Sequence, residues 1–216
     1  MSIEENISEL KRRLPEDINL IAVSKTKSAD MIKEAYNTGI RDFGENKVQE
    51  LTDKIDKLPD DINWHFIGHL QTNKVKYIVG KVSLIHSLDS VKLLKEIEKQ
   101  YKKENLTADV LLEINIGKEE SKSGIFAEDL DDIISECEMC EHVKVRGLMA
   151  IIPKGDENSC RNYFRQMKSI WDTLNNKSYN NVSMEYLSMG MTTDYELAIE
   201  EGSNMIRIGT GIFGLR

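Results

Sequence analysis

The sequence lacks an excess of basic residues. Its 216 residues include 29 lysines and arginines against 37 aspartates and glutamates, which gives a formal net charge of −8. Binding to a nucleic-acid backbone depends on cationic side chains that release counterions from the phosphates. This charge balance offers little such drive, so we expect no nucleic-acid partner.

Long apolar runs are also absent. No stretch approaches the roughly 18 apolar residues that a membrane-spanning helix requires. The segment from Met1 to Asn6 lacks the basic and then apolar layout of a signal peptide. We therefore expect a cytoplasmic protein that does not enter a membrane.

Cysteine is scarce, and the three residues present cannot all pair with one another, which is typical of a reducing compartment. Cys137 and Cys140 form a C-x-x-C, but the pair falls inside a helical pattern and no second ligand pair follows at zinc-finger spacing. The histidines His65, His86 and His142 do not have the i, i+4 spacing of a helical metal site. We expect these cysteines and histidines to be structural, with no metal site.

Proline is rare, and no low-complexity segment, internal repeat or proline- or glycine-rich linker divides the chain. We therefore expect residues 1–216 to form one domain. Within it, short apolar runs alternate with polar segments of helical length and periodicity. The apolar runs cover residues 20–25, 41–45, 64–68, 84–88, 109–115, 143–151, 184–189 and 205–209, and the helical segments include 29–38, 46–58, 91–103, 130–140, 159–174 and 194–201.

This alternation predicts the fold class. About eight β units with helical crossovers match a single-domain (β/α)8 barrel of the TIM type. An open doubly wound sheet gives the same alternation and is the alternative. At the start of the chain, apolar residues at 3, 7, 10 and 14 predict an extra amphipathic helix over residues 1–14 that packs on the barrel.

Lys25 ends the first apolar run. In such barrels the chemistry lies at the carboxyl ends of the strands. Alternation along the strand puts Ile21, Val23 and Lys25 on one face, so Lys25 points into the barrel mouth if the two apolar side chains fill the interior. A lysine at the end of a buried strand either reaches solvent or serves as an amine nucleophile toward a carbonyl.

Two further polar residues follow the second and third runs. Asn46 could cap the helix that comes next, or it could present its amide to a ligand. His69 is the one histidine placed just after a strand at the active end of the barrel. We therefore treat both as candidates for a binding site at the barrel mouth.

The loops after the last two runs contain small and hydroxyl-bearing residues. Barrels often bind phosphate with the loops after strands seven and eight, because exposed backbone N–H groups attract anions. Ser188 lies at the end of the seventh run, and Gly209 and Thr210 lie where the eighth run ends. These residues and the loops that follow them predict a ligand with a phosphate group. Thr193 and Glu196 have the spacing of a capping box for the next helix.

Arg207 lies within the eighth run. Alternation places it on the face opposite Ile206 and Ile208. If that face is the barrel interior, the guanidinium needs an acceptor. The carboxylate of Glu113 would be a structural acceptor, and a heteroaromatic ring nitrogen of a ligand would be a functional one.

An amine, a phosphate site and an arginine directed at a ring acceptor together describe a site for pyridoxal 5′-phosphate (PLP). Seven segments of the chain resemble, in order, the YggS-like pyridoxal phosphate homeostasis proteins. They are residues 22–27 (AVSKTK), 43–46 (FGEN), 65–71 (HFIGHLQ), 121–124 (SKSG), 146–149 (RGLM), 187–191 (LSMGM) and 207–210 (RIGT). The resemblance implies a fold-type III, alanine-racemase-like PLP barrel.

The resemblance also implies the roles of eight residues. Lys25 would form a Schiff base with the cofactor, and Arg207 would donate to the pyridine nitrogen. The phosphate would be held by Ser188, Gly209 and Thr210, and the ring pocket would be lined by Asn46, His69 and Met149. The chain has Ser28 and Thr192 where the family often has proline and serine, and neither change removes a chemical group that the site needs.

The family is regarded as binding and buffering PLP, supplying it to PLP-dependent apo-enzymes and influencing amino- and keto-acid metabolism, without established catalytic turnover. An arginine at the pyridine nitrogen makes the ring a weaker electron sink. The racemases also use a tyrosine base from a C-terminal β domain, which we do not expect here. The resemblance therefore implies a monomeric PLP-binding protein that is not an enzyme.

Two alternatives remain open at this point. One is a PLP-dependent amino-acid racemase, with Lys25 as one base and His69 or Tyr186 as the other. The second is an aldolase that forms a Schiff base with its substrate at Lys25 and needs no cofactor.

Overall fold

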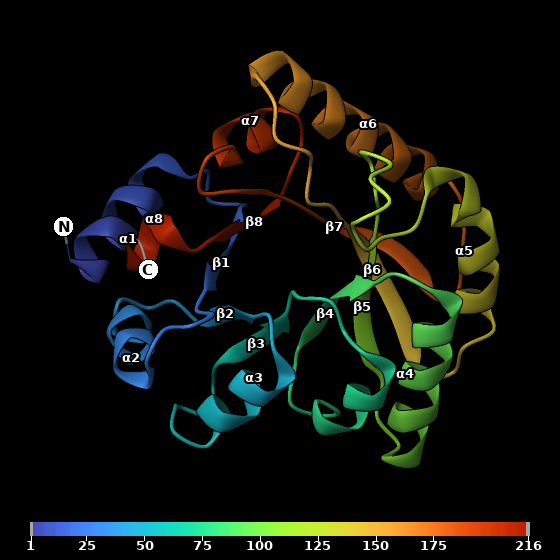
Figure 1. Cartoon of the computed structure of the whole chain (residues 1–216), viewed down its shortest axis with the longest axis horizontal. Helices are drawn as coiled ribbons and strands as arrows, with labels where there is room; N and C mark the ends of the chain where they lie inside the picture. Colours follow the sequence, from blue (N-terminus) through green and yellow to red (C-terminus); the bar gives the residue numbers. More distant parts are fainter. Residues whose placement is uncertain (1, 215–216) are drawn as a thin grey trace.

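Eight parallel strands close into a barrel in chain order (Figure 1). The computed structural model describes residues 2–214, and in it β1 pairs with both β2 and β8. This closure confirms the (β/α)8 prediction over the open sheet. The strands are β1 (Asn19–Val23), β2 (Asp42–Glu45), β3 (Asn63–Phe66), β4 (Leu84–Leu88), β5 (Ala108–Glu113), β6 (Val143–Met149), β7 (Val182–Met191) and β8 (Met205–Ile208).

Helices surround the ring of strands (Figure 1). They are α1 (Ile3–Arg13), α2 (Ala29–Asn37), α3 (Val48–Ile55), α4 (Val91–Lys103), α5 (Leu130–Glu138), α6 (Glu157–Asn175), α7 (Tyr195–Glu200) and α8 (Thr210–Phe213), with 3₁₀ helices η1 (Thr72–Tyr77) and η2 (Ala127–Asp129). Every helical segment expected from the sequence is present, and η1 supplies the crossover between β3 and β4. Within residues 2–214, no helix has both the length and the apolar character needed to cross a bilayer.

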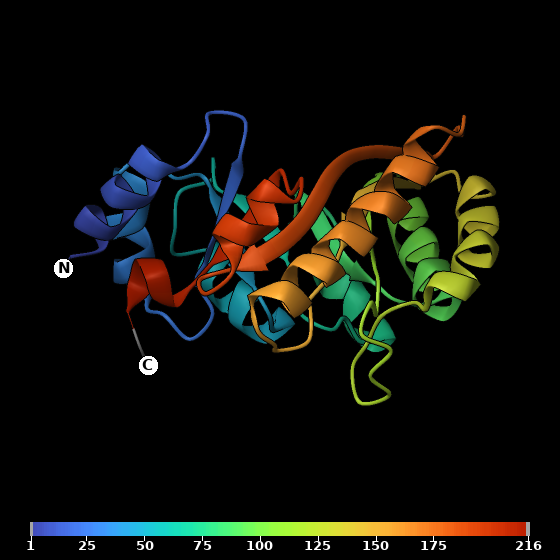
Figure 2. The ribbon, with the colours of Figure 1, turned by 90° about the horizontal axis from the view of Figure 1, so that it is seen from above.

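The N-terminal helix α1 packs beside α2 and α8 (Figures 1 and 2). Ser2 and Glu5 form a capping box at its start, and its apolar stripe is buried, with Ile7 only 1% exposed. The amide of Asn6 donates to the carbonyl of Ile212 over 2.9 Å. The first and last helices are therefore joined by apolar burial and by a hydrogen bond.

A small apolar cluster fills the barrel interior. It contains Ile21, Leu84, Leu111, Met149 and Met205, which come from β1, β4, β5, β6 and β8. Residues from five strands meet only where side chains point inward. The interior position of Ile21 agrees with the alternation expected along β1, and it leaves the next inward positions of β1 for the barrel mouth.

The capping box predicted before α7 is wrong. The N-cap residue of α7 is Asp194, and it makes no side-chain capping bond. Its carboxylate turns back and accepts a hydrogen bond from the backbone N–H of Met191 over 2.6 Å. The Asp194 side chain therefore stabilises the turn after β7 and does not cap α7.

The C-x-x-C motif lies at the end of α5. Cys137 is buried in the helix, and Cys140 is partly buried just after the helix ends. Burial raises the pKa of the Cys137 thiol to about 12 and that of the Cys140 thiol to about 11. Both side chains therefore stay protonated at neutral pH, a state in which they are poor nucleophiles and poor metal ligands.

Candidate ligand-binding site

A cavity of about 300 Å³ lies at the carboxyl ends of the strands. That volume is at the lower end of the range for small-molecule sites. Five of the eight predicted site residues line it, namely Lys25, Asn46, Arg207, Gly209 and Thr210. The other lining residues are Val23, Ile67, Ile151, Met191, Thr192 and Thr193.

The remaining three predicted residues lie elsewhere. Ser188 is fully buried in β7, and Met149 belongs to the apolar cluster of the barrel interior. His69 lines a neighbouring cavity of about 590 Å³, which also touches Asn46. The Nδ1 atom of His69 lies 3.0 Å from Oδ2 of Asp89 and 3.2 Å from the hydroxyl of Ser123. Ser123 belongs to the loop after β5, which projects from the body of the barrel (Figure 2).

Lys25 lies in a tight turn directly after β1. The strand ends at Val23, two residues earlier than the apolar run suggested. Thr26 has a φ of +65°, a left-handed conformation that is uncommon for a residue other than glycine. The backbone N–H of Lys27 donates to the carbonyl of Ser24 over 3.0 Å and closes the turn. Lys25 therefore reaches the cavity from a constrained loop.

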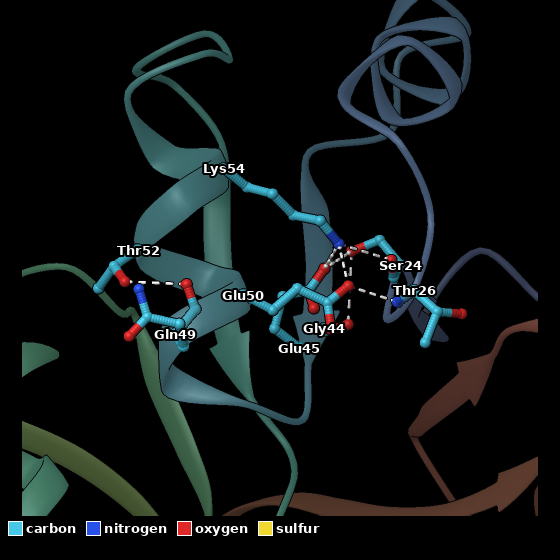
Figure 3. Close-up of polar contacts among 8 residues, drawn as sticks. All are labelled: Ser24, Thr26, Gly44, Glu45, Gln49, Glu50, Thr52 and Lys54. Carbon is cyan, nitrogen blue, oxygen red and sulfur yellow. Dashed lines mark hydrogen bonds and ion pairs between the residues drawn. The ribbon is translucent and has the colours of Figure 1, made fainter.

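A buried ionic network holds this turn (Figure 3). The Lys54 ammonium of α3 donates to the Ser24 carbonyl (2.9 Å), to Oε1 of Glu45 (2.7 Å) and to Oε1 of Glu50 (2.6 Å). The Ser24 hydroxyl also donates to Glu45 Oε1 over 2.6 Å. The backbone N–H of Thr26 donates to Glu50. The residues on both sides of Lys25 are thus fixed to β2 and α3.

The network places charge where little water reaches. The Glu45 side chain is fully buried and that of Lys54 is 9% exposed. Burial raises the pKa of Glu45, while its hydrogen bonds with Lys54 and Ser24 act in the opposite direction. The sequence offered one signal, because Glu50 and Lys54 have the i, i+4 spacing of a helical ion pair. It did not show that this face of α3 points at the Lys25 turn.

Arg207 is held by the barrel wall. Its Nη1 donates to the carbonyl and the hydroxyl of Ser188, at 2.8 and 2.6 Å, and its Nη2 donates to the carbonyl of Ala150 at 2.9 Å. Burial lowers the pKa of Arg207 to about 10, although the charge of Glu113 acts to raise it. Among the described residues, Arg207 makes no ion pair with Glu113. Its acceptors are two carbonyls and a hydroxyl, and the side chain still lines the cavity.

Asn46 does not cap the following helix. The N-cap of α3 is Lys47, without a side-chain capping bond, and Oδ1 of Asn46 is buried with no hydrogen-bond partner among the described residues. Gly68 packs directly on Asn46, since a Cβ there would lie 2.3 Å from the Asn46 carbonyl oxygen. Buried polar groups are normally paired, so Asn46 is available to a ligand.

The loops after β7 and β8 meet at the opposite wall of the cavity. Met191, Thr192 and Thr193 line it beside Gly209 and Thr210. The backbone N–H of Gly211 donates to the Thr192 hydroxyl over 3.3 Å and joins the two loops. The sequence predicted a phosphate site in the loop after the seventh run and named Ser188 as its residue there. Because β7 continues to Met191, the residues of this segment that reach the cavity are Met191, Thr192 and Thr193.

Comparison with known proteins shows the family of this chain. The family model for the N-terminal domain of alanine racemase matches residues 1–216. The pyridoxal phosphate homeostasis protein of Aquifex aeolicus is 48% identical over 199 residues, which cover 91% of this chain and 86% of that protein. The chain belongs to the pyridoxal phosphate homeostasis protein family. Another relative with that name, from Escherichia coli K12, is 40% identical over 210 residues, covering 94% of this chain and 88% of its own.

Solved structures show the same relationship. PipY of Synechococcus elongatus without PLP superposes with a TM-score of 0.93 at 35% identity, covering 99% of this chain and 100% of PipY. The PLP-bound PipY structure gives a TM-score of 0.90 at 34% identity. Alanine racemase from E. faecalis shares the fold, with a TM-score of 0.78 at 16% identity over 58% of that enzyme. The resemblance seen in the sequence is thereby confirmed.

Proposed function

We propose that this chain binds pyridoxal 5′-phosphate in the 300 Å³ cavity and acts in PLP homeostasis. The observation that carries the proposal is the meeting of a lysine, an arginine and two hydroxyl-bearing loops on one small cavity. The PLP-bound structure of the relative PipY and the names of the curated relatives support the same ligand.

The residues present fit the cofactor. Lys25 offers an amine for its aldehyde, and Asn46 offers a buried amide oxygen that has no hydrogen-bond partner within residues 2–214. Gly209 and Thr210 would hold the phosphate together with Thr192, the linked residue of the loop after β7. Ser188 is no longer among the residues that we assign to the phosphate, because its hydroxyl is fully buried against Arg207.

Bound PLP supplies an electron sink, and Arg207 limits how strong that sink can be. A guanidinium whose pKa is about 10 keeps its protons at neutral pH, so it donates a hydrogen bond and does not protonate a ring nitrogen. An unprotonated pyridine accepts electrons less readily. This property supports a protein that holds the cofactor over an enzyme that turns over amino acids.

The two alternatives have less support. A racemase needs a second base on the cavity. Tyr186 instead packs on the apolar cluster of the interior, and His69 lines the neighbouring cavity. A cofactor-free aldolase would use Lys25 but gives no role to Arg207. The proposed monomeric state, the cytoplasmic location, the supply of apo-enzymes and the influence on amino- and keto-acid metabolism stay predictions.

The test is the absorption spectrum of the purified protein mixed with PLP. We expect a near-visible band from the lysine-bound cofactor, and we expect Lys25→Ala to lack it. Lys33→Ala is the matched control, because Lys33 is exposed on α2 and is not among the residues that line the cavity. A band that survives unchanged in Lys25→Ala would overturn the assignment of Lys25.

A further inference from the structure

Beneath the cavity, five polar side chains form a continuous chain through the barrel. Oδ1 of Asp42 lies 3.1 Å from Nε2 of His65, and Nδ1 of His65 lies 2.9 Å from Nε2 of His86. Nδ1 of His86 lies 3.2 Å from the Ser188 hydroxyl, which accepts from Arg207 over 2.6 Å. Each member contacts the next, with no gap.

The chain runs from one face of the barrel to the other. Asp42 is the first residue of β2 and its side chain is 43% exposed. His86 and Ser188 lie on β4 and β7, which are not neighbours, so their contact crosses the interior. Arg207 lies near the carboxyl end of β8 and lines the cavity. The two histidines and Ser188 between these ends are buried.

Donor chemistry gives every link one direction. Arginine can only donate, so the Ser188 oxygen accepts from Arg207. Among the described residues the only other partner of this hydroxyl is Nδ1 of His86, so the hydroxyl proton is directed there. A neutral histidine that accepts at Nδ1 carries its proton on Nε2, and that proton is directed at Nδ1 of His65. By the same rule, His65 carries its proton on Nε2 and donates to Asp42.

The Asp42 end of the chain predicts the same proton positions independently of the Arg207 end. A carboxylate only accepts hydrogen bonds, so Asp42 alone would also direct the His65 proton to Nε2. In the middle, burial lowers the pKa of His86 well below its ordinary value, and the charge of Arg207 acts in the same direction. His86 is therefore neutral, as the chain requires. If His86 donated to Ser188, both neighbours would donate to the serine oxygen, and the buried hydroxyl proton would have no acceptor among the described residues.

We propose that His65 and His86 are positioning residues that, with Ser188, orient the Arg207 guanidinium on the cavity wall through a one-directional chain of hydrogen bonds from Asp42. Ser188 transmits the orientation because it contacts both His86 and Arg207. Neither histidine lines the cavity, so both act on a ligand only through Arg207.

The first test uses the full chain without ligand. Nitrogen-15 NMR of the histidine rings at neutral pH should show both His65 and His86 as neutral rings with the proton on Nε2. A scalar coupling should connect Nε2 of His86 to Nδ1 of His65. A proton on Nδ1 of either ring would overturn the proposal.

The second test asks whether the chain reaches Arg207. We expect His86→Phe to shift the Arg207 side-chain N–H signals in the ligand-free protein, although His86 does not touch Arg207. The matched control is His142→Phe, since the His142 ring bonds the Leu106 carbonyl at the surface. If His86→Phe does not fold, His65→Phe, one link further away, is measured instead. Arg207 signals identical to those of the wild type would overturn the proposal.

A third measurement, which rests on the proposed function, is PLP affinity. We expect about tenfold weaker binding in His86→Phe and unchanged binding in His142→Phe; unchanged binding in His86→Phe would refute transmission to the ligand. A wild-type protein that binds no PLP would refute the proposed function, whereas the proton positions in the ligand-free protein would still decide the hydrogen-bond chain.

Discussion

The two basic residues of the cavity wall are supported in opposite ways. Beside Lys25 the support is ionic, with Lys54 between Glu45 and Glu50. Behind Arg207 it is a neutral chain of two histidines and a serine. Burying an ion costs much hydration free energy, so its stability depends on every partner that remains. Burying a neutral polar group costs less, and what matters is that each donor faces an acceptor. The Lys25 side should therefore be sensitive to charge, and the Arg207 side to geometry.

The largest expected effect is on the ionic side. Lys54→Met leaves Glu45 buried without its cation, and such a loss typically costs about 3–5 kcal/mol. We expect a decrease of that size in the free energy of unfolding measured in urea. Lys57→Met, at an exposed position of the same segment, should stay within about 0.5 kcal/mol of the wild type. A Lys54→Met loss below about 1 kcal/mol would contradict the ionic account.

Removing both charges should be less damaging than removing one. In the double variant Glu45→Gln with Lys54→Met, no unpaired buried charge remains, so we expect it to be more stable than Lys54→Met alone by about 1–3 kcal/mol. A double-mutant cycle in urea measures this coupling. Simple additivity of the two single losses would show that the network acts by packing and not by charge.

A pH effect is expected near Arg207. Burial, with a smaller contribution from Asp89, raises the pKa of Glu113 from 4.5 to about 7. The folded state thus holds a proton that the unfolded state has released, so stability should fall as pH rises from about 4.5 to 7, by on the order of 1–3 kcal/mol. Glu113→Gln should remove this part of the pH dependence. If the stability of the wild type and of Glu113→Gln changed in parallel with pH, the assignment of this effect to Glu113 would be refuted.

The smallest effect belongs to the neutral chain. Ser188→Ala removes one hydroxyl, while Arg207 keeps the carbonyls of Ser188 and Ala150. We expect a loss of about 1 kcal/mol in thermal or urea unfolding. The control is Ser183→Ala, on the same strand but with its hydroxyl bonded to Val145 and Glu185. If Ser188→Ala lost as much free energy of unfolding as Lys54→Met, the contrast between the ionic network beside Lys25 and the neutral chain behind Arg207 would not hold.

The sequence predicted the barrel well because strands and helices each leave a periodic pattern of apolar residues. Alternation of apolar runs with helical segments needs no knowledge of long-range contacts, and all eight strands were expected. Strand ends were less certain. An error of two residues at the end of β7 was enough to place Ser188 at the mouth, although the strand continues to Met191. The capping box at Thr193 failed for a similar local reason, since Asp194 bonds the preceding turn.

By itself, the sequence determined the order of strands and helices and the inward face of β1, which led to Lys25. It also placed Arg207, Gly209 and Thr210 at the last strand. Only the tertiary structure decided that α3 turns Lys54 toward the Lys25 turn and that His86 reaches Ser188 across the barrel. Periodicity reports which face of an element is buried, but pairing between side chains on non-adjacent elements depends on barrel closure and register, which no local pattern contains.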